Sequence, residues 1–174
     1  MSTFITNLIE IKSLALAKEN ENQQFQILLK ELDTDQLDSA VFELNEQIST
    51  AIDCTQCGNC CRSFMINVEE QEIAVAADFL EESTANFIEK YIEVGSSGRM
   101  IINTIPCHFL SEKKCTIYTA RFSGCREFPH LHEPGFSKRL FTMFQYYSIC
   151  PIIFNVLEGL KLKMADLQAK RPLN

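Results

Sequence analysis

The stretch DCTQCGNCCRSF, residues 53–64, places four cysteines within eight consecutive positions: Cys54, Cys57, Cys60 and Cys61. Such a run can bind a metal, carry out redox chemistry or form disulfides. Each two-residue spacer lets the chain turn tightly enough for successive sulfur atoms to reach one inorganic centre. A small residue inside the run, here Gly58, leaves backbone N–H groups free to point at sulfur. The run therefore predicts a metal-binding centre around which this part of the chain folds.

Four more cysteines lie further along the chain: Cys107, Cys115, Cys125 and Cys150. Bacterial ferredoxins combine the C-x2-C-x2-C spacing with a remote Cys-Pro pair, and Cys150 is followed by Pro151. One division of the eight thiols therefore joins Cys150 to the first three cysteines of the run. It leaves a second set of four, made of Cys61, Cys107, Cys115 and Cys125.

Zinc is the main competitor to an iron–sulfur cluster. All-cysteine zinc sites usually take two C-x2-C pairs, one from each of two turns. This chain instead has two overlapping pairs in one place and single cysteines elsewhere. The arrangement favours an iron–sulfur cluster of the [4Fe–4S] type as the cofactor, and zinc, including two zinc ions, is the alternative.

Length and composition indicate an ordinary folded protein. The chain has 174 residues, of which 46% are hydrophobic, enough for a sizeable core. Its beginning lacks the basic start, apolar stretch and cleavage site of a signal peptide. No run approaches the roughly 18 apolar residues that span a bilayer. We therefore expect a cytoplasmic protein with no membrane partner, in which reduced thiols bind metal in preference to forming disulfides.

Charge is unevenly spread along the chain, whose net charge is −7. Residues 1–98 carry 5 Lys and Arg against 18 Asp and Glu, whereas residues 99–139 carry 7 against 3. So acidic a protein is a poor general nucleic-acid binder, and no nucleic-acid partner is expected. The basic segment contains three cysteines, and a centre with four thiolates carries a charge of about −2. Nearby arginines would stabilise that charge; an ordinary solvated basic face is the alternative.

Hydrophobic spacing predicts a mainly helical chain. A helix is expected at about 3–31 and another at 35–52, the second capped by Asp33 or Thr34. Together they predict a helical hairpin that ends at the cysteine run. Further helices are expected at four places: residues 69–80, 83–94, 137–149 and 151–169.

The segment between these helices predicts short strands. Residues 99–105 have the β-branched content of a strand, and two short strands joined at SEKK, residues 111–114, bring Cys107 near Cys115. The expected fold class is α+β but mainly α, with helices packed around a cysteine-rich metal-binding centre that includes a short β-hairpin. We expect an accessory helical hairpin over 1–52, packed on a cysteine-rich domain with C-terminal helices over 53–174.

Three histidines are weaker candidates for metal ligands: His108, His130 and His132. An H-x-H pair can bind metal when the chain is extended, but histidines in polar loops are more often surface residues. The sequence has no recognisable order of Ser, His and Asp, no phosphate-binding glycine loop and no paired catalytic carboxylates. Whether the chain is an enzyme therefore stays open.

The cysteine blocks together resemble the YkgJ-type, or CxxCxxCC, family. That family is described as a zinc- or iron-chelating domain, and its members are often called Fe–S-cluster-containing proteins. The resemblance covers roughly residues 54–151 and implies metal binding by all eight cysteines. It rests on five blocks in order: CTQCGNCC at 54–61, PCHFL at 106–110, CTIYTAR at 115–121, CREFP at 125–129 and CP at 150–151.

Other residues of these blocks match as well, with one departure. Tyr118, Arg121, Arg126 and Pro129 stand where the family has them, and we expect Arg121 and Arg126 at the cofactor. The family usually has Arg-Pro before its Cys-Arg block, whereas here Phe122 follows Arg121. Phe does not fix φ as Pro does, so the turn into Cys125 is expected to differ slightly.

Three functions are compatible with these observations. The first is a metal-cluster protein in electron transfer, redox sensing or metal handling, with an unidentified protein or redox partner. The second is an enzyme, because a flagellin lysine N-methylase contains a domain related to this family. The third is a structural zinc module whose acidic helices bind another protein.

Overall fold

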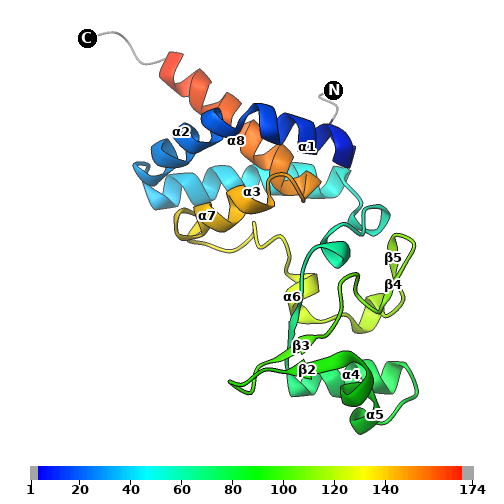
Figure 1. The fold of residues 1–174 in the computed structure, drawn as a ribbon. Helices are drawn as coiled ribbons and strands as arrows, with labels where there is room; N and C mark the ends of the chain where they lie inside the picture. Colours follow the sequence, from blue (N-terminus) through cyan, green and yellow to red (C-terminus); the bar gives the residue numbers. More distant parts are fainter. Residues whose placement is uncertain (1–3, 170–174) are drawn as a thin grey trace. The chain divides into compact units, whose positions relative to one another are not determined.

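A computed structural model describes residues 4–169 of the chain. The chain is mainly helical and forms two compact units, which Figure 1 shows as ribbons. One unit, the helical unit, consists of Met1–Asp53 and Pro129–Asn174. The other, the cysteine unit, is Cys54–Phe128. Seven of the eight cysteines lie in the cysteine unit, and Cys150 lies in the helical unit.

Five helices build the described part of the helical unit. They are α1 (Leu8–Ala17), α2 (Glu19–Lys30), α3 (Thr34–Ala51), α7 (Phe136–Tyr146) and α8 (Pro151–Ala169). Helix α3 packs against both α7 and α8, α2 packs against α7, and α1 packs against α8. Gly159 allows the close approach of α8 to α3, because a Cβ at this position would lie 2.9 Å from Leu44 Cδ2.

The expected helix at 3–31 is wrong in its extent, since the structure has two helices there. Asn7 caps α1 by accepting hydrogen bonds from the N–H groups of Ile9 and Glu10, so the described residues before it are not helical. The helix then breaks at Lys18, whose ammonium pairs with Glu158 of α8. No Gly or Pro marks this break, so the sequence gives no local signal for it.

The other helices of this unit confirm their sequence signals. Asp33 caps α3, because its carboxylate accepts a hydrogen bond from the Gln36 N–H at 3.0 Å. Pro151 is the first residue of α8, a position where its missing N–H leaves no partner unsatisfied. Buried residues of the helical unit come from four of its helices: Phe25, Leu37, Val41, Leu140, Phe154 and Leu157.

The cysteine unit combines short helices and strands. Its elements are η1 (Cys54–Gln56), η2 (Cys60–Arg62), β1 (Asn67–Val68), α4 (Glu70–Phe79), α5 (Thr84–Tyr91), β2 (Ile92–Val94), β3 (Met100–Ile102), β4 (Leu110–Ser111), β5 (Lys114–Cys115), η3 (Tyr118–Ala120) and α6 (Ser123–Arg126). Strand β3 lies between β1 and β2 in an antiparallel sheet, and β4 pairs with β5 in a separate hairpin.

One strand prediction and one helix prediction for this unit have different outcomes. The hairpin joined at residues 111–114 is confirmed, with Leu110 opposite Cys115. The helix expected over 83–94 ends early, because Ile92–Val94 leaves α5 and pairs with β3, placing Glu93 opposite Ile101. Its β-branched residues belong to a sheet edge whose partner lies further along the chain, so helical spacing alone misassigns them.

An apolar core lies behind the sheet and helices of the cysteine unit. Phe109 is 5.7 Å from Phe87 between ring centroids, in a stacked arrangement, and 6.2 Å from Phe122. Cys107, Cys115 and Cys125 pack against this core without being fully buried. The buried residues of the core are Val68, Ile73, Ala76, Ala77, Phe87, Ile92, Ile102, Phe109, Ile117 and Phe122.

Within residues 4–169, no single helix has both the length and the apolar composition to cross a membrane. Phe136–Tyr146 and Pro151–Ala165 reach that threshold only as a pair, with a bend of 119° between them.

Asp38 joins α3 to the start of α7, and the contribution of this link to stability can be tested. Its buried carboxylate accepts hydrogen bonds from the N–H groups of Gly135 at 2.6 Å and Phe136 at 2.8 Å, where α7 begins. Replacing Asp38 with Ala should lower the free energy of unfolding by about 2–4 kcal/mol, because two N–H groups lose a charged acceptor. Urea unfolding followed by circular dichroism measures the change. Glu46→Ala, at an exposed position of the same helix, is the control, and an equal effect of both variants would contradict this role.

Candidate metal centre

Five cysteines of the cysteine unit affect the pKa values of one another, and we name them the thiol cluster: Cys60, Cys61, Cys107, Cys115 and Cys125. Each is partly buried. A main-chain hydrogen bond from Cys107 N–H to the Cys61 carbonyl, 2.8 Å long, joins the run to the second block. Cys115 comes from β5 and Cys125 from α6. Segments far apart in sequence therefore supply the cluster.

Cys60 and Cys61 are adjacent in sequence, and their Sγ atoms lie 4.0 Å apart. The hydrogen bond between them lowers the pKa of Cys60 to about 7, with a smaller favourable effect from Arg121. The same bond, together with burial and the charge of the neighbouring thiols, raises the pKa of Cys61. One proton shared between two adjacent sulfurs explains the opposite directions.

The remaining thiols of the cluster are harder to ionise than an ordinary cysteine. Burial raises the pKa of Cys125 to about 12, and the charges of Cys107, Cys60 and Cys115 act in the same direction. Burial is also the main reason that the pKa values of Cys107 and Cys115 are raised. A cation bound among these sulfurs would offset the repulsion between thiolates. It would also stabilise the deprotonated form of each thiol that binds it.

The two arginines expected at the cofactor have different places. The Arg121 guanidinium lies 4.0 Å from the centre of the Tyr118 ring, and its charge favours ionisation of Cys60, Cys115 and Cys125. Arg126 instead donates a hydrogen bond to the Arg121 carbonyl and lies 3.8 Å from Glu72. Arg121 therefore acts on the thiols directly, and Arg126 supports the segment around it.

The residue that departs from the family pattern keeps the conformation of proline. Phe122 has φ of −62°, the value to which a proline ring fixes the backbone. Its side chain is only 2% exposed and packs in the core of the cysteine unit. The turn into Cys125 is therefore held by burial of the ring instead of by the covalent constraint of proline.

The other three predicted ligands are Cys54, Cys57 and Cys150. Cys54 is exposed at the start of η1, and Cys57 donates its N–H to the Cys54 carbonyl at 3.1 Å. Cys150 is buried in the helical unit, where its carbonyl accepts a hydrogen bond from Phe154 N–H at 2.9 Å. None of the eight cysteines, all within the described residues, forms a disulfide.

The cysteine run is anchored to the β4–β5 hairpin by two residues that have no sulfur. Gly58 has φ of +61°, and a Cβ on it would lie 2.8 Å from the Lys113 carbonyl oxygen. Arg62 donates hydrogen bonds to the carbonyls of Gly58 and Glu112. Sequence reasoning noted Gly58 only as a small residue and missed Arg62, although its place directly after Cys61 was visible.

Glu72 connects α4 to the segment that contains Cys125. Its carboxylate accepts hydrogen bonds from the N–H groups of Glu69 and Ser123, and it faces Arg126. Burial opposes ionisation of Glu72, but these N–H donors and Arg126 outweigh it, so the pKa of Glu72 is lowered. This carboxylate was not recognised in the sequence, because Ser123 lies 51 residues away from it.

The histidines have protein partners. His108 Nε2 lies 2.6 Å from Asn103 Oδ1, and its ring makes an edge contact with Tyr91. His130 Nδ1 lies 2.7 Å from Glu133 Oε1 in the helical unit. His108 is exposed, as was expected of loop histidines from the sequence, and His130 is partly buried.

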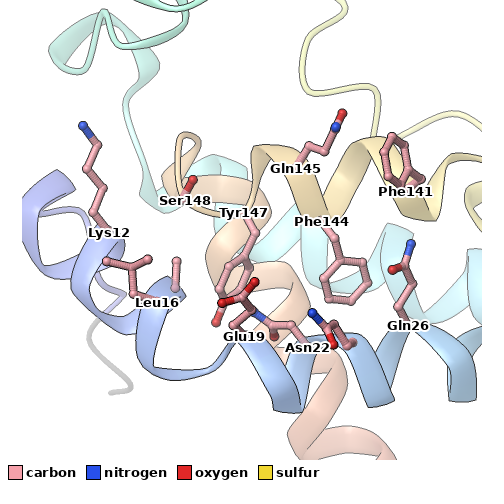
Figure 2. Close-up of a pocket in the computed structure, with 12 residues that line it drawn as sticks. Lys12, Leu16, Glu19, Asn22, Gln26, Phe141, Phe144, Gln145, Tyr147 and Ser148 are labelled. Atoms are coloured by element: carbon pink, nitrogen blue, oxygen red, sulfur yellow. The ribbon is translucent and has the colours of Figure 1, made fainter.

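The helical unit also contains an open groove, which Figure 2 shows in close-up. It has a volume of about 670 Å³ and is lined by residues of α1, α2 and α7, with Leu16, Phe141 and Phe144 among its apolar walls. Asn22 accepts a hydrogen bond from Lys161 at 2.6 Å, and Tyr147 donates one to Glu158 at 2.7 Å. Two polar groups of the groove are thus committed to the ion pairs that hold the helices together.

The chemistry of the thiol cluster fits a metal. Thiolates are the soft ligands that zinc and iron–sulfur clusters take, and the five sulfurs already share one electrostatic environment. A tetrahedral ion with bonds of about 2.3 Å places its sulfur ligands about 3.8 Å apart, close to the Cys60–Cys61 separation. Within the described residues, no group of three or more His, Cys, Asp or Glu side chains already converges on one ion position.

Comparison with known proteins adds one match. Residues 53–150 match the CxxCxxCC family, described as "Putative zinc- or iron-chelating domain". The match includes all eight cysteines of the chain. No curated protein and no solved structure matches the chain. The family agrees with the resemblance seen in the cysteine blocks and with a metal-binding function.

The contribution to stability of the close approach between Gly58 and the hairpin can be measured. Gly58→Ala should lower the free energy of unfolding of the cysteine unit by about 2–4 kcal/mol, because it adds a backbone clash to left-handed strain. Gly98→Ala is a matched control, since Gly98 has φ of +77° with no atom within 4 Å of its added Cβ. It should lose only about 1 kcal/mol. Thiol labelling across a urea series reports on this unit, and equal losses would show that the contact with Lys113 contributes nothing.

Glu72 makes the cysteine unit sensitive to acid. Because its folded pKa is lowered, its contribution to stability is present above the unfolded pKa of 4.5 and is lost as pH falls through the folded value. Glu72→Gln should lower the free energy of unfolding at pH 7 by about 1–2 kcal/mol and flatten its pH dependence below 4.5. Urea unfolding at pH 7 and at a series of acidic pH values tests this. If the free energy of unfolding depends on acidic pH in the variant as it does in the wild type, Glu72 is not the source of this sensitivity.

Proposed function

We infer that the chain, which belongs to the CxxCxxCC family of zinc- or iron-chelating domains, holds an iron–sulfur cluster on its cysteines. The observation that supports this most is the placing of the thiol cluster. The Sγ atoms of Cys60 and Cys61 lie 4.0 Å apart, Cys107 N–H donates to the Cys61 carbonyl, and the thiols of Cys107, Cys115 and Cys125 pack against one core. All eight cysteines remain the proposed ligands, with Cys60, Cys61, Cys107, Cys115 and Cys125 as the core of the site.

The residues around the thiols suit such a group. Four thiolates on a [4Fe–4S]2+ cluster carry about −2 in total, and Arg121 supplies a positive charge that acts on three of the thiols. The apolar core beneath Cys107, Cys115 and Cys125 excludes water from one side. When bound, a cluster would supply one-electron transfer, so we propose a role in redox chemistry or metal handling with a protein redox partner in the cytoplasm.

Zinc is the second candidate, and one distance favours it. The 4.0 Å between the Sγ atoms of Cys60 and Cys61 is near the separation of two ligands on one tetrahedral ion. In that case the centre would be structural or protein-binding. Colour separates the two candidates at once, because zinc thiolates have no visible absorption.

Metal analysis decides between these proposals. Protein purified without oxygen should contain iron and acid-labile sulfide in about equal amounts, near four of each per chain for one cluster. Zinc without sulfide would overturn the iron–sulfur assignment and leave the structural zinc centre. Neither metal in well-folded protein would overturn metal binding itself.

Single substitutions identify the ligands. Cys107→Ser and Cys125→Ser should each reduce bound metal by at least about tenfold at limiting metal, because a neutral hydroxyl replaces a thiolate ligand. Met65→Ser, which removes an exposed sulfur from the same unit, is the control and should bind like the wild type. Metal content after desalting is the readout. Full metal content in both cysteine variants would exclude these two residues from the site.

A further inference from the structure

The guanidinium of Arg62 spans two parts of the cysteine unit that are far apart in sequence. Its Nη1 donates hydrogen bonds to the carbonyl oxygens of Gly58 at 3.0 Å and Cys57 at 3.4 Å. Its Nη2 donates to the carbonyl oxygen of Glu112, in the turn between β4 and β5. All three acceptors are main-chain atoms, so the contact fixes backbone positions instead of neutralising a carboxylate.

The two parts that Arg62 joins both contribute cysteines to the thiol cluster. Residues 57–61 include Cys60 and Cys61, and the hairpin contains Cys115 at the end of β5. The run also touches the turn directly, since the Lys113 carbonyl lies where a side chain on Gly58 would be. Two independent contacts thus hold the run against the hairpin.

We propose that Arg62 is a positioning residue for the metal centre, which clamps the cysteine run to the β4–β5 hairpin and so presents Cys60 and Cys61 to the centre that Cys115 shares. The inference rests on the proposed metal-binding function. The planar fork of arginine matches the task, because it can donate to acceptors on two segments at once. A lysine ammonium in the same place would bond to the cysteine run or to the hairpin, and would therefore hold the two segments together less firmly.

The test uses cobalt(II) titration of the metal-free full-length chain, followed by the absorption of cobalt–thiolate bonds. Arg62→Gln should raise the Kd for cobalt about tenfold, the range seen when residues that orient metal ligands are removed. Arg62→Lys should fall between this variant and the wild type. Arg99→Gln removes the same charge from an exposed position of the same unit and should leave the Kd unchanged.

A double-mutant cycle separates positioning from general stability. If Arg62 acts by bringing the hairpin's thiol to the run, Arg62→Gln should have little further effect on affinity in a Cys115→Ser background. The two effects should add if Arg62 only stabilises the unit, and additivity would overturn the proposal. An unchanged Kd in folded Arg62→Gln would also overturn it. If that variant loses its circular dichroism signal, Arg62→Lys becomes the test, and an affinity equal to the wild type is then the contradicting result.

Failure of the clamp and failure of the metal site give different results. A wild-type chain that contains neither iron and sulfide nor zinc when purified without oxygen, and that shows no cobalt–thiolate absorption, would contradict metal binding and leave nothing for Arg62 to position. A wild-type chain that binds cobalt, beside an Arg62→Gln variant that binds it equally well, would contradict only the clamp.

Discussion

The main-chain hydrogen bond from Cys107 N–H to the Cys61 carbonyl, 2.8 Å long, determines where the cysteine run meets the rest of its unit. Because it uses backbone atoms, it leaves both thiols available for a metal. The next block is fixed in the same way, since Leu110 N–H donates to the Cys107 carbonyl and Thr116 N–H to the Phe109 carbonyl. Backbone bonds thus hold the segments that contain Cys61, Cys107 and Cys115 next to one another.

Electrostatics explains why such a group of thiols benefits from a metal. Burial raises the pKa values of Cys107, Cys115 and Cys125, and each thiolate would raise those of its neighbours further. Only Cys60 is displaced toward ionisation, helped by its bond to Cys61 and by Arg121. Without a cation the cluster therefore keeps most of its protons. Metal binding must release those protons, so affinity should fall in acid, as it does for thiolate sites in general.

The sequence contained the local parts of this structure but not the contacts between them. Asp33 and Pro151 marked the starts of α3 and α8, because capping depends on a few neighbouring residues. Strand β2 was missed, since it depends on its distant partner β3, and the break at Lys18 was missed because no Gly or Pro marks it. The spacing of the run predicted a metal centre, and the family resemblance implied all eight cysteines as ligands. The predicted set of Cys61, Cys107, Cys115 and Cys125 lacked Cys60, whose pKa effects reach thiols more than 40 residues away.

The apolar core against which Cys107, Cys115 and Cys125 pack determines how far the fold of the cysteine unit depends on metal. Small zinc modules lack such a core and unfold when the metal leaves. Here ten buried residues, including Phe87, Phe109 and Phe122, form a core that contains no metal ligand. Arg62 and Gly58 add contacts between the run and the β4–β5 hairpin that are equally independent of sulfur. The sheet and α4 are therefore stabilised by the core. The cysteine run contributes thiols to the cluster but no residue to the core, so its order depends most on metal.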